Sequence, residues 1–305
     1  MTPTIFHEDW WLNAATSGGY ETVEVMDKGK TVGRLPYYRR RKFGIMWGAL
    51  PPLTHFLGPA VDVGSGSITS RFNRRLEVTR ELLGKLPPSH FTKIKCHHGI
   101  REVIAFQDMK FRTSVQFTYE IAPQPEDMLL KNMNQNTRRN LRSIEEGAVY
   151  VNDVDPAEYL AFYDRNLSEQ GRRNHLDLAI CKNLLTLSLD RGVGKFYAQR
   201  NMAGELIAGV FCVWDDVASY YLMTSRSSKA GSGAITWLIW EAIKDAAKRG
   251  LIFDFDGLGG GGSIQIYNGF GGSIEPRYTA TRMSLPMTIS HDIVRRLLNK
   301  EQYFY

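Results

Sequence analysis

The chain has 305 residues and a mass of 34.6 kDa, with 43% hydrophobic and 23% charged residues, as in an ordinary globular protein. This composition excludes a disordered, collagen-like or disulfide-rich chain, and the length favours two lobes over one. Lys and Arg outnumber Asp and Glu by 38 to 32, which gives a net charge of +6. This excess mildly favours an anionic ligand, although a modest excess also serves solubility alone.

The cysteines and the N-terminus indicate a cytoplasmic protein. Cys96, Cys181 and Cys212 lie far apart and form no CxxC pair, so we expect reduced thiols. No run approaches the ~18 apolar residues of a membrane span, and no secretory signal precedes the first charged residues. We therefore expect no transmembrane segment. We also expect no metal site, because the pair His97 and His98 has no third ligand at metal spacing.

The first half predicts mixed strands and helices. Residues 21–26 and 31–38 predict the two strands of a hairpin, and residues 44–59, rich in Gly, Pro and aromatics, predict a loop with short strands. The other elements expected here are an amphipathic helix over 72–86, strands over 91–96 and 111–121, and a helix over 128–146 ended by Gly147.

The second half has clearer periodicity. The expected strands are 149–151, 195–200, 205–214, 217–224 and 252–256, and the expected helices are 156–170, 176–189 and 234–248. We see no exact internal repeat, but both halves share one outline: a hairpin, a loop, a helix, a strand and a final strand.

A glycine-rich loop precedes the predicted helix at residue 234. Gly231 and Gly233 lie where a helix begins, so backbone N–H groups can approach an anion there. Arg226 and Lys229 add positive charge to the same loop. The alternative is a strand-to-helix connection that needs glycine only for its conformation.

Two carboxylates end the predicted strand 252–256. Alternation places Asp254 and Asp256 on one face of the strand and Phe253 and Phe255 on the other. A carboxylate at the end of a buried strand is costly unless it is paired or used. We expect Asp256 to bind or deprotonate an amine, whereas Asp254 equally fits a residue that accepts loop N–H groups.

Two further stretches are candidate binding elements. Arg138 and Arg142 are four residues apart on one helix face, which suits a phosphate, although a solvated basic face explains them equally. Residues 266–272 place glycines around Phe270, which predicts a tight turn that lines a pocket, or a plain hairpin turn with one buried Phe.

Three of these stretches, in this order, resemble a known family. They are residues 136–142 (NTRRNLR) with the glycine that follows, 253–257 (FDFDG) and 267–272 (YNGFGG). They are similar to the Fem-type transferases, which build peptidoglycan cross-bridges from aminoacyl-tRNA, and to related acyltransferases of the GNAT superfamily. The likeness spans nearly the whole chain, and the order of the motifs is more specific than any one of them.

The resemblance implies an α/β (α+β) fold of two GNAT-like lobes, each a mixed, mostly antiparallel sheet flanked by helices, with a cleft between them. Residues 1–124 would form the N-terminal lobe, and residues 125–305 the C-terminal lobe that holds the acyl donor. A co-substrate, aminoacyl-tRNA or acyl-CoA, takes the place of a tightly bound cofactor, and no metal is implied.

The resemblance also implies roles for particular residues. Asp256 would be the catalytic base, unless a substrate phosphate serves instead, and the donor would bind at Arg226, Lys229, Gly231 and Gly233. The acceptor, an amine of a cell-wall precursor, amino sugar or small metabolite, would bind near Arg39, Tyr38, Arg138, Arg142, Tyr267 and Asn268. The sequence departs from the family at Tyr267, where the family has lysine, and at Ser228, where a Gln or Arg usually opens the CoA loop.

Two functions remain open from the sequence. The first is an N-acyltransferase, and the alternative is a non-catalytic RNA- or nucleotide-binding protein that retains the fold and binds in a salt-sensitive way. DNA is not an expected partner in either case. We favour the enzyme because the carboxylate strand and the glycine loop fall in one lobe. The pI near 9.1 favours tRNA as donor and the glycine step favours CoA, so the donor stays open.

Overall fold

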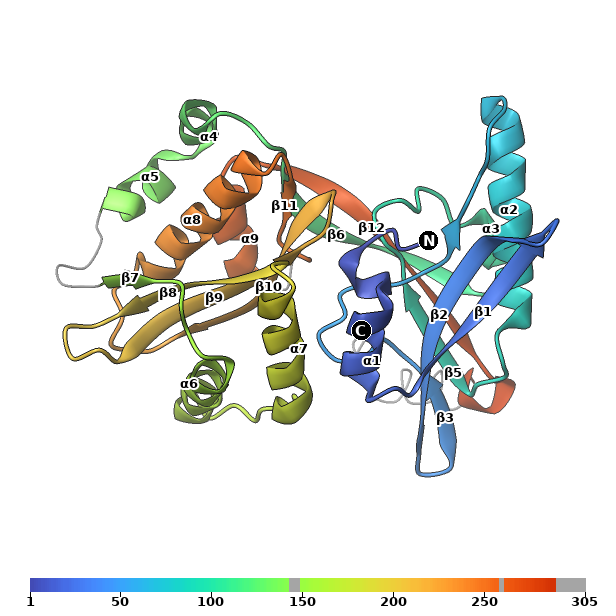
Figure 1. Cartoon of the computed structure of the whole chain (residues 1–305), viewed down its shortest axis with the longest axis horizontal. Helices are drawn as coiled ribbons and strands as arrows, with labels where there is room; N and C mark the ends of the chain where they lie inside the picture. Colours follow the sequence, from blue (N-terminus) through green and yellow to red (C-terminus); the bar gives the residue numbers. More distant parts are fainter. Residues whose placement is uncertain (143–148, 258–260, 289–305) are drawn as a thin grey trace. The chain divides into compact units, whose positions relative to one another are not determined.

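The computed structural model describes residues 1–142, 149–257 and 261–288, and the chain divides into two compact units (Figure 1). Unit 1 comprises residues 1–115 together with residues 277–288, and unit 2 comprises residues 116–276. Two strands, β6 (Arg112–Ile121) and β12 (Ser273–Met283), begin in one unit and end in the other. The lobes predicted from the sequence, 1–124 and 125–305, stay a prediction.

Unit 1 is built on a sheet with strand order β1-β2-β3-β5-β12. The predicted hairpin is confirmed, because β1 and β2 pair antiparallel. Strands β3 and β5 are parallel, and the helix α2 connects them. The elements are η1 (Ile5–His7), α1 (Asp9–Thr16), β1 (Tyr20–Asp27), β2 (Lys30–Lys42), β3 (Ile45–Gly48), β4 (Ala60–Val61), α2 (Ile68–Lys85), β5 (Phe91–Lys95) and α3 (Ile104–Asp108).

Unit 2 is built on a sheet with strand order β6-β11-β10-β9-β8-β7. Helix α8 lies on one face of this sheet, and α6 and α7 lie on the other (Figure 1). All nine residues of β9 are therefore buried. The elements are α4 (Glu126–Asn132), α5 (Gln135–Arg142), β7 (Val149–Val151), α6 (Pro156–Glu169), α7 (Leu178–Asp190), β8 (Gly194–Arg200), β9 (Leu206–Trp214), β10 (Ala218–Arg226), α8 (Ala234–Lys248), β11 (Ile252–Asp254) and α9 (Gly261–Asn268).

The two units contain the same crossover, and a short sequence repeat marks it. In unit 1 the chain passes from β3 through α2 to the parallel strand β5, and in unit 2 it passes from β10 through α8 to the parallel strand β11. The segment Gly-Ser-Gly-x-Ile-Thr opens the helix both times, at residues 64–69 and 231–236. The two segments differ only at the fourth position, which is Ser67 in unit 1 and Ala234 in unit 2.

Most predicted elements are confirmed, and two are corrected. The expected helix 128–146 is broken at Met133 into α4 and α5, and its expected end at Gly147 lies outside the described residues. The stretch 266–272, predicted as a tight turn that lines a pocket or as a plain hairpin turn, contains the last residues of α9, a turn at residues 269–270 and the entry into β12, so it is not a hairpin. Among the described residues, no helix is both long and apolar enough to cross a bilayer.

The turn after α9 packs closely against the segment between α4 and α5. Phe270 is buried, and a side-chain carbon added at Gly271 would lie 2.3 Å from the carbonyl oxygen of Asn132. Gly271 also has a φ of +80°, which L-residues rarely adopt. The glycine is therefore required both by the conformation and by the lack of space.

We expect Gly271→Ala to destabilise the protein by at least about 2 kcal/mol more than Gly250→Ala, because the first adds overpacking to an unfavourable φ. Gly250 is a matched control, since its φ is +74° and nothing lies within 4 Å of its added carbon. Urea unfolding of both variants measures the difference. Equal losses of stability would contradict the close packing described above.

Candidate functional site

A gap in the sheet of unit 2 opens where β11 ends. Strand β10 pairs with β11 only from Ala218 to Tyr220, and β10 then continues to Arg226 without this neighbour. Strand β11 stops at Asp254. Phe255 still donates its N–H to the carbonyl of Tyr119 in β6, and the chain turns at Asp256 and Gly257, both of which have a positive φ. Ligands of open α/β sheets gather at the carboxyl ends of strands where neighbouring strands separate, so the gap is the natural place for a site.

The turn that ends β11 is held by a buried carboxylate. Asp254 is 1% exposed, and its Oδ1 accepts a hydrogen bond from the Thr118 hydroxyl at 2.6 Å and from the backbone N–H of Asp256 at 2.8 Å. The same hydroxyl oxygen accepts the N–H of Gly257 at 2.9 Å. Asp254 therefore holds the turn, which is the structural role that the sequence left open for it.

Asp256 follows in a different environment. Its φ is +50°, which places it in the left-handed region that Asp tolerates better than most residues, and it is only partly buried. The alternation predicted from the sequence stops short of it, because the regular strand ends at Asp254. Phe253 and Phe255 both face the hydrophobic core of unit 2, as predicted.

A pocket of about 720 Å³ lies beside the free part of β10. We call it the β10–α8 pocket; its walls come from α6 and the residues after it, β10 and its following loop, α8 and α9. Its volume falls within the roughly 300–1,000 Å³ of small-molecule sites. Many of its lining side chains are hydroxyls or amides, among them Asn166, Thr224, Ser225, Ser227, Ser228 and Thr236.

The charge of this pocket is positive. Arg172 and Arg226 line it, and the lining residues described by the structure include no carboxylate. Guanidinium groups pair well with phosphates, and hydroxyls add neutral donors. The lining therefore suits an anionic, phosphate-bearing ligand.

The N-terminus of α8 borders the same pocket and is uncapped. Gly233 occupies the N-cap position and has no side chain to accept the first N–H groups of the helix. In the repeat of unit 1, by contrast, the Ser67 hydroxyl accepts the N–H of Ser70 at 3.1 Å. Unit 1 also places Asp62 two residues before its Gly-Ser-Gly segment, where unit 2 has Lys229.

Asp62 makes the unit 1 loop unfavourable for an anion. Its Oδ1 accepts the N–H of Gly64 at 3.0 Å, and this hydrogen bond, followed by the one from Lys30, lowers the pKa of Asp62. A carboxylate thus already occupies the loop N–H in unit 1. Of the two copies, only the loop of unit 2 combines a helix N-terminus without a side-chain cap with an arginine, Arg226, that lines the adjoining pocket.

Aromatic side chains form the floor of the β10–α8 pocket. The Tyr267 ring stacks on Phe255 with centroids 4.1 Å apart and an interplanar angle of 25°. Tyr221 is 8% exposed and also lines the pocket, and burial raises its pKa above the ordinary value for tyrosine. Tyr221 therefore stays protonated at neutral pH, so its hydroxyl can donate a hydrogen bond.

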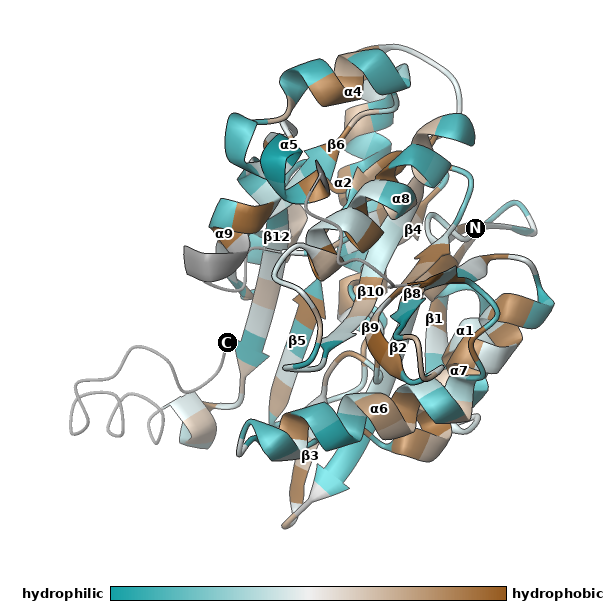
Figure 2. Ribbon diagram, turned by 90° about the vertical axis from the view of Figure 1, so that its left-hand side faces the viewer, coloured by the Kyte–Doolittle hydropathy of each residue, from teal (hydrophilic) through white to brown (hydrophobic). Residues whose placement is uncertain are grey.

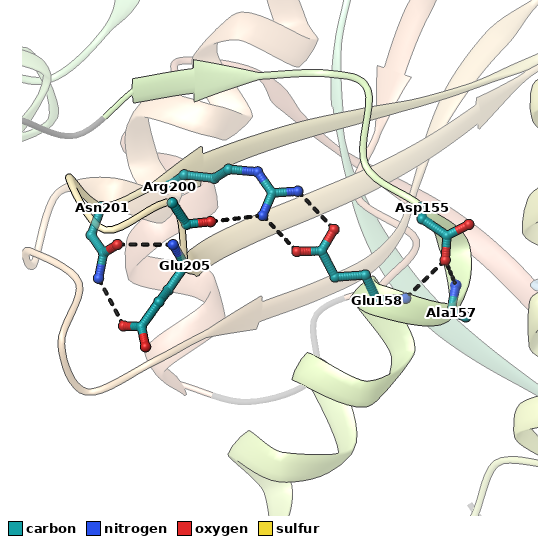
Figure 3. Close-up of polar contacts among 7 residues, drawn as sticks. Asp155, Ala157, Glu158, Arg200, Asn201 and Glu205 are labelled. Atoms are coloured by element: carbon teal, nitrogen blue, oxygen red, sulfur yellow. Dashed lines mark hydrogen bonds and ion pairs between the residues drawn. The ribbon is translucent and has the colours of Figure 1, made fainter.

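The predicted donor residues lie at different distances from this pocket. Arg226 lines it directly, and Gly231 and Gly233 lie at the start of α8. Lys229 is exposed, does not line the pocket, and pairs with Glu205 at 3.4 Å. Figure 3 shows the Glu205 side chain in the turn between β8 and β9, hydrogen-bonded to the side chain of Asn201.

The same close-up shows how α6 is fixed beside the sheet. Arg200 of β8 forms a bidentate ion pair with Glu158 of α6, at 2.5 and 2.7 Å (Figure 3). Asp155 caps the helix by accepting the N–H groups of Ala157 and Glu158. These contacts position α6, which supplies one wall of the pocket.

The predicted acceptor residues are spread over both units. In unit 2, Tyr267 lines the β10–α8 pocket, Asn268 accepts a hydrogen bond from the Tyr119 hydroxyl, and Arg138 is exposed on α5. Arg142 ends α5, and its side chain lies outside the described part. Arg39 and Tyr38 lie in unit 1.

Arg39 and Tyr38 line a narrow pocket of unit 1, of about 30 Å³. Arg39 pairs with Glu21 at 3.1 Å, while its buried Nε has no hydrogen-bond partner in the described part of the chain. Lys93 lines the same pocket, and burial, followed by the charge of Lys95, lowers its pKa. This pocket also suits an anionic group.

Sequence reasoning missed the contribution of α6. Asn166 is 4% exposed, and its Nδ2 donates to the Ser225 hydroxyl at 2.8 Å. The sequence contained a signal, because Asn166 lies four residues after Phe162 and seven after Tyr159, on the apolar stripe of the predicted helix. Arg172, which follows the helix, and Tyr221 were missed as well.

The fold is shared with tandem GNAT proteins, and most of the residues that line the β10–α8 pocket lie within a segment that matches a GNAT family model. Residues 131–264 match the family described as acetyltransferase (GNAT) domain. The predicted resemblance to Fem-type and related GNAT-superfamily acyltransferases is confirmed. A comparison with curated protein sequences gives no match.

Solved structures of low sequence identity share this fold over most of their length. The chain is similar to FemX, with a TM-score of 0.65, 11% identity and 93% of each chain covered. It is also similar to the C-terminal domain of a protein assigned as a lysylphosphatidylglycerol synthetase from Agrobacterium fabrum. The TM-score is 0.59 and the identity 12%, with 93% of this chain and 91% of that chain covered. For a tandem GNAT protein from the clavulanic acid biosynthesis pathway, the TM-score is 0.52 and the identity 12%, with 87% of this chain and 83% of that chain covered.

We expect Thr118→Val to destabilise the protein by about 2–4 kcal/mol, because it removes a donor from the buried Asp254 carboxylate and an acceptor from Gly257. Thr118→Ser keeps the hydroxyl and should lose about 1 kcal/mol or less. Urea unfolding measures both. A Val variant as stable as the Ser variant would show that the hydroxyl does not hold the turn.

Proposed function

We propose that the chain is an N-acyltransferase that binds an activated acyl donor in the β10–α8 pocket and transfers its acyl or aminoacyl group to an amine. The observation that supports this most is the convergence of Arg172, Arg226, several hydroxyls and the uncapped start of α8 on one pocket. The match of residues 131–264 to the GNAT acetyltransferase domain supports the same reaction class.

The donor is an acyl-CoA or an aminoacyl-tRNA. Both molecules carry phosphates and a reactive carbonyl. The carbonyl belongs to a thioester in acyl-CoA and to a ribose ester in aminoacyl-tRNA. The phosphates would pair with Arg226 and with the N–H groups at the start of α8. The adjacent aromatic floor, with Tyr267 stacked on Phe255, offers a flat surface near the carbonyl end.

The reaction needs one proton removed and one proton supplied. The amine nitrogen forms a bond to the carbonyl carbon and loses a proton, for which we propose the Asp256 carboxylate as acceptor. The C–S or C–O bond to the donor then breaks, and the leaving sulfur or oxygen takes a proton. We propose that this proton comes from the Tyr221 hydroxyl, because Tyr221 lines the same pocket.

The acceptor is an amine-bearing molecule with an anionic group, such as a cell-wall precursor, an amino sugar or a small metabolite. The residues proposed for it are those that the resemblance implies, from Tyr38 and Arg39 to Arg138, Arg142 and Asn268. The support from the structure is the buried Nε of Arg39, which lacks a hydrogen-bond partner among the described residues and faces a pocket that also holds Lys93.

We expect Arg226→Ala to weaken donor binding by about 10- to 100-fold, since a charged hydrogen bond contributes about 1.5–3 kcal/mol. Lys229→Ala is the matched control: it removes a nearby cation that pairs with Glu205 and does not line the pocket. Titration calorimetry with acetyl-CoA, and filter binding with aminoacylated tRNA, distinguish the two donors. Equal effects of the two variants would place the donor elsewhere.

We expect Asp256→Asn to lower turnover by about 100-fold or more while donor affinity stays unchanged, because the amide cannot accept the proton. Asp216→Asn, in the exposed turn before β10, is the control. Single-turnover acyl transfer to a panel of amines measures the step. Unchanged turnover removes Asp256 from the mechanism, and salt-sensitive RNA binding without any transfer would support the non-catalytic alternative.

A further inference from the structure

The β2–β3 hairpin projects from the sheet of unit 1 (Figure 1). Its strands pair from Arg39 opposite Gly48 to Lys42 opposite Ile45. The turn consists of Phe43 and Gly44, both with positive φ. The Phe43 side chain is 91% exposed, which is the highest exposure among the large hydrophobic residues that the structure describes.

The two strands of this hairpin differ in character. The β2 strand contributes consecutive cations up to Lys42, whereas the β3 strand contributes Ile45, Met46 and Trp47. Figure 2 shows the contrast, with hydrophilic colour on the end of β2 and hydrophobic colour on β3. Residues 40–47 contain no acidic residue. The projecting end is therefore both cationic and apolar.

A second exposed apolar side chain lies near the base of the same hairpin. The backbone N–H of His90 donates to the carbonyl of Met46, and the N–H of Ser284 donates to the carbonyl of His90. The next residue, Leu285, is 74% exposed. Met46, His90 and Leu285 all belong to unit 1, and Leu285 directly follows the residue whose N–H binds the carbonyl of His90.

Such a combination fits a lipid surface better than water, RNA or a protein core. The Phe43 side chain is 91% exposed and so is accessible to a lipid layer, whereas an aliphatic side chain such as Leu285 does not stack on bases. Aromatic and aliphatic side chains flanked by arginines are instead suited to the boundary between anionic headgroups and acyl chains.

We propose that the β2–β3 hairpin docks the protein on an anionic phospholipid surface, with Phe43 inserted among the acyl chains and Arg40 and Arg41 on the headgroup phosphates. This interaction is independent of the donor pocket, which lies in unit 2. It brings the protein to a membrane reversibly, and it suits an acceptor that is itself at or in a membrane.

The test is flotation of the full chain with vesicles of phosphatidylcholine alone and of phosphatidylcholine with phosphatidylglycerol. Wild type should float with the anionic vesicles and lose binding as salt rises. Phe43→Ser should weaken binding about tenfold or more, and Arg40→Gln with Arg41→Gln about fivefold for each charge removed.

The matched controls lie in unit 2 and should bind as wild type does. Met202→Ser removes a side chain that is 82% exposed, and Lys182→Gln with Lys248→Gln removes two exposed cations. Thermal unfolding confirms that each variant is folded. Wild type that fails to bind anionic vesicles at low salt overturns the proposal. A Phe43→Ser variant that binds anionic vesicles as strongly as wild type also overturns it. The same holds for a Phe43→Ser variant that loses binding to total tRNA but keeps binding to vesicles.

Discussion

Asp254 is a buried carboxylate, and a buried carboxylate needs hydrogen-bond donors to replace water. Thr118 and the N–H of Asp256 supply them, and both draw the chain into a turn at the end of β11. Strand β11 therefore stops while β10 continues to Arg226. The pocket lies beside the unpaired part of β10 and includes Tyr267 of α9, whereas Asp256 follows the turn and is not among its lining residues.

The duplicated crossover explains why one unit, and not both, is suited to an anionic donor. Both helices begin at the same Gly-Ser-Gly-x-Ile-Thr segment. In unit 1 the N–H groups are taken by Asp62 and Ser67, which also places a negative charge in the loop. In unit 2 these positions are Lys229 and Ala234, so neither side chain competes with a ligand. We therefore expect a phosphate to bind at the loop of unit 2 and not at its copy in unit 1.

Much of the fold could be predicted because its signals are local. The alternation of 21–26 and 31–38 and the apolar run of 234–248 identified a hairpin and a helix that the structure contains. The site was predicted less completely. Arg226 was identified because it belongs to the glycine-rich loop before α8, and Tyr267 through the family resemblance, whereas Arg172 and Tyr221 reach the pocket only through tertiary packing. The break of the helix at Met133 also depends on tertiary packing, because Asn134 donates its N–H to the distant carbonyl of Gly269.

The account depends most on the claim that the loop and helix start of unit 2, and not their copies in unit 1, bind the donor phosphates. Hydrogen–deuterium exchange, with coenzyme A and separately with aminoacylated tRNA, tests this directly. The account predicts slower exchange of amides in residues 227–236 with at least one of the two ligands, and unchanged exchange in residues 62–70. Protection of residues 62–70 in place of 227–236 would contradict it.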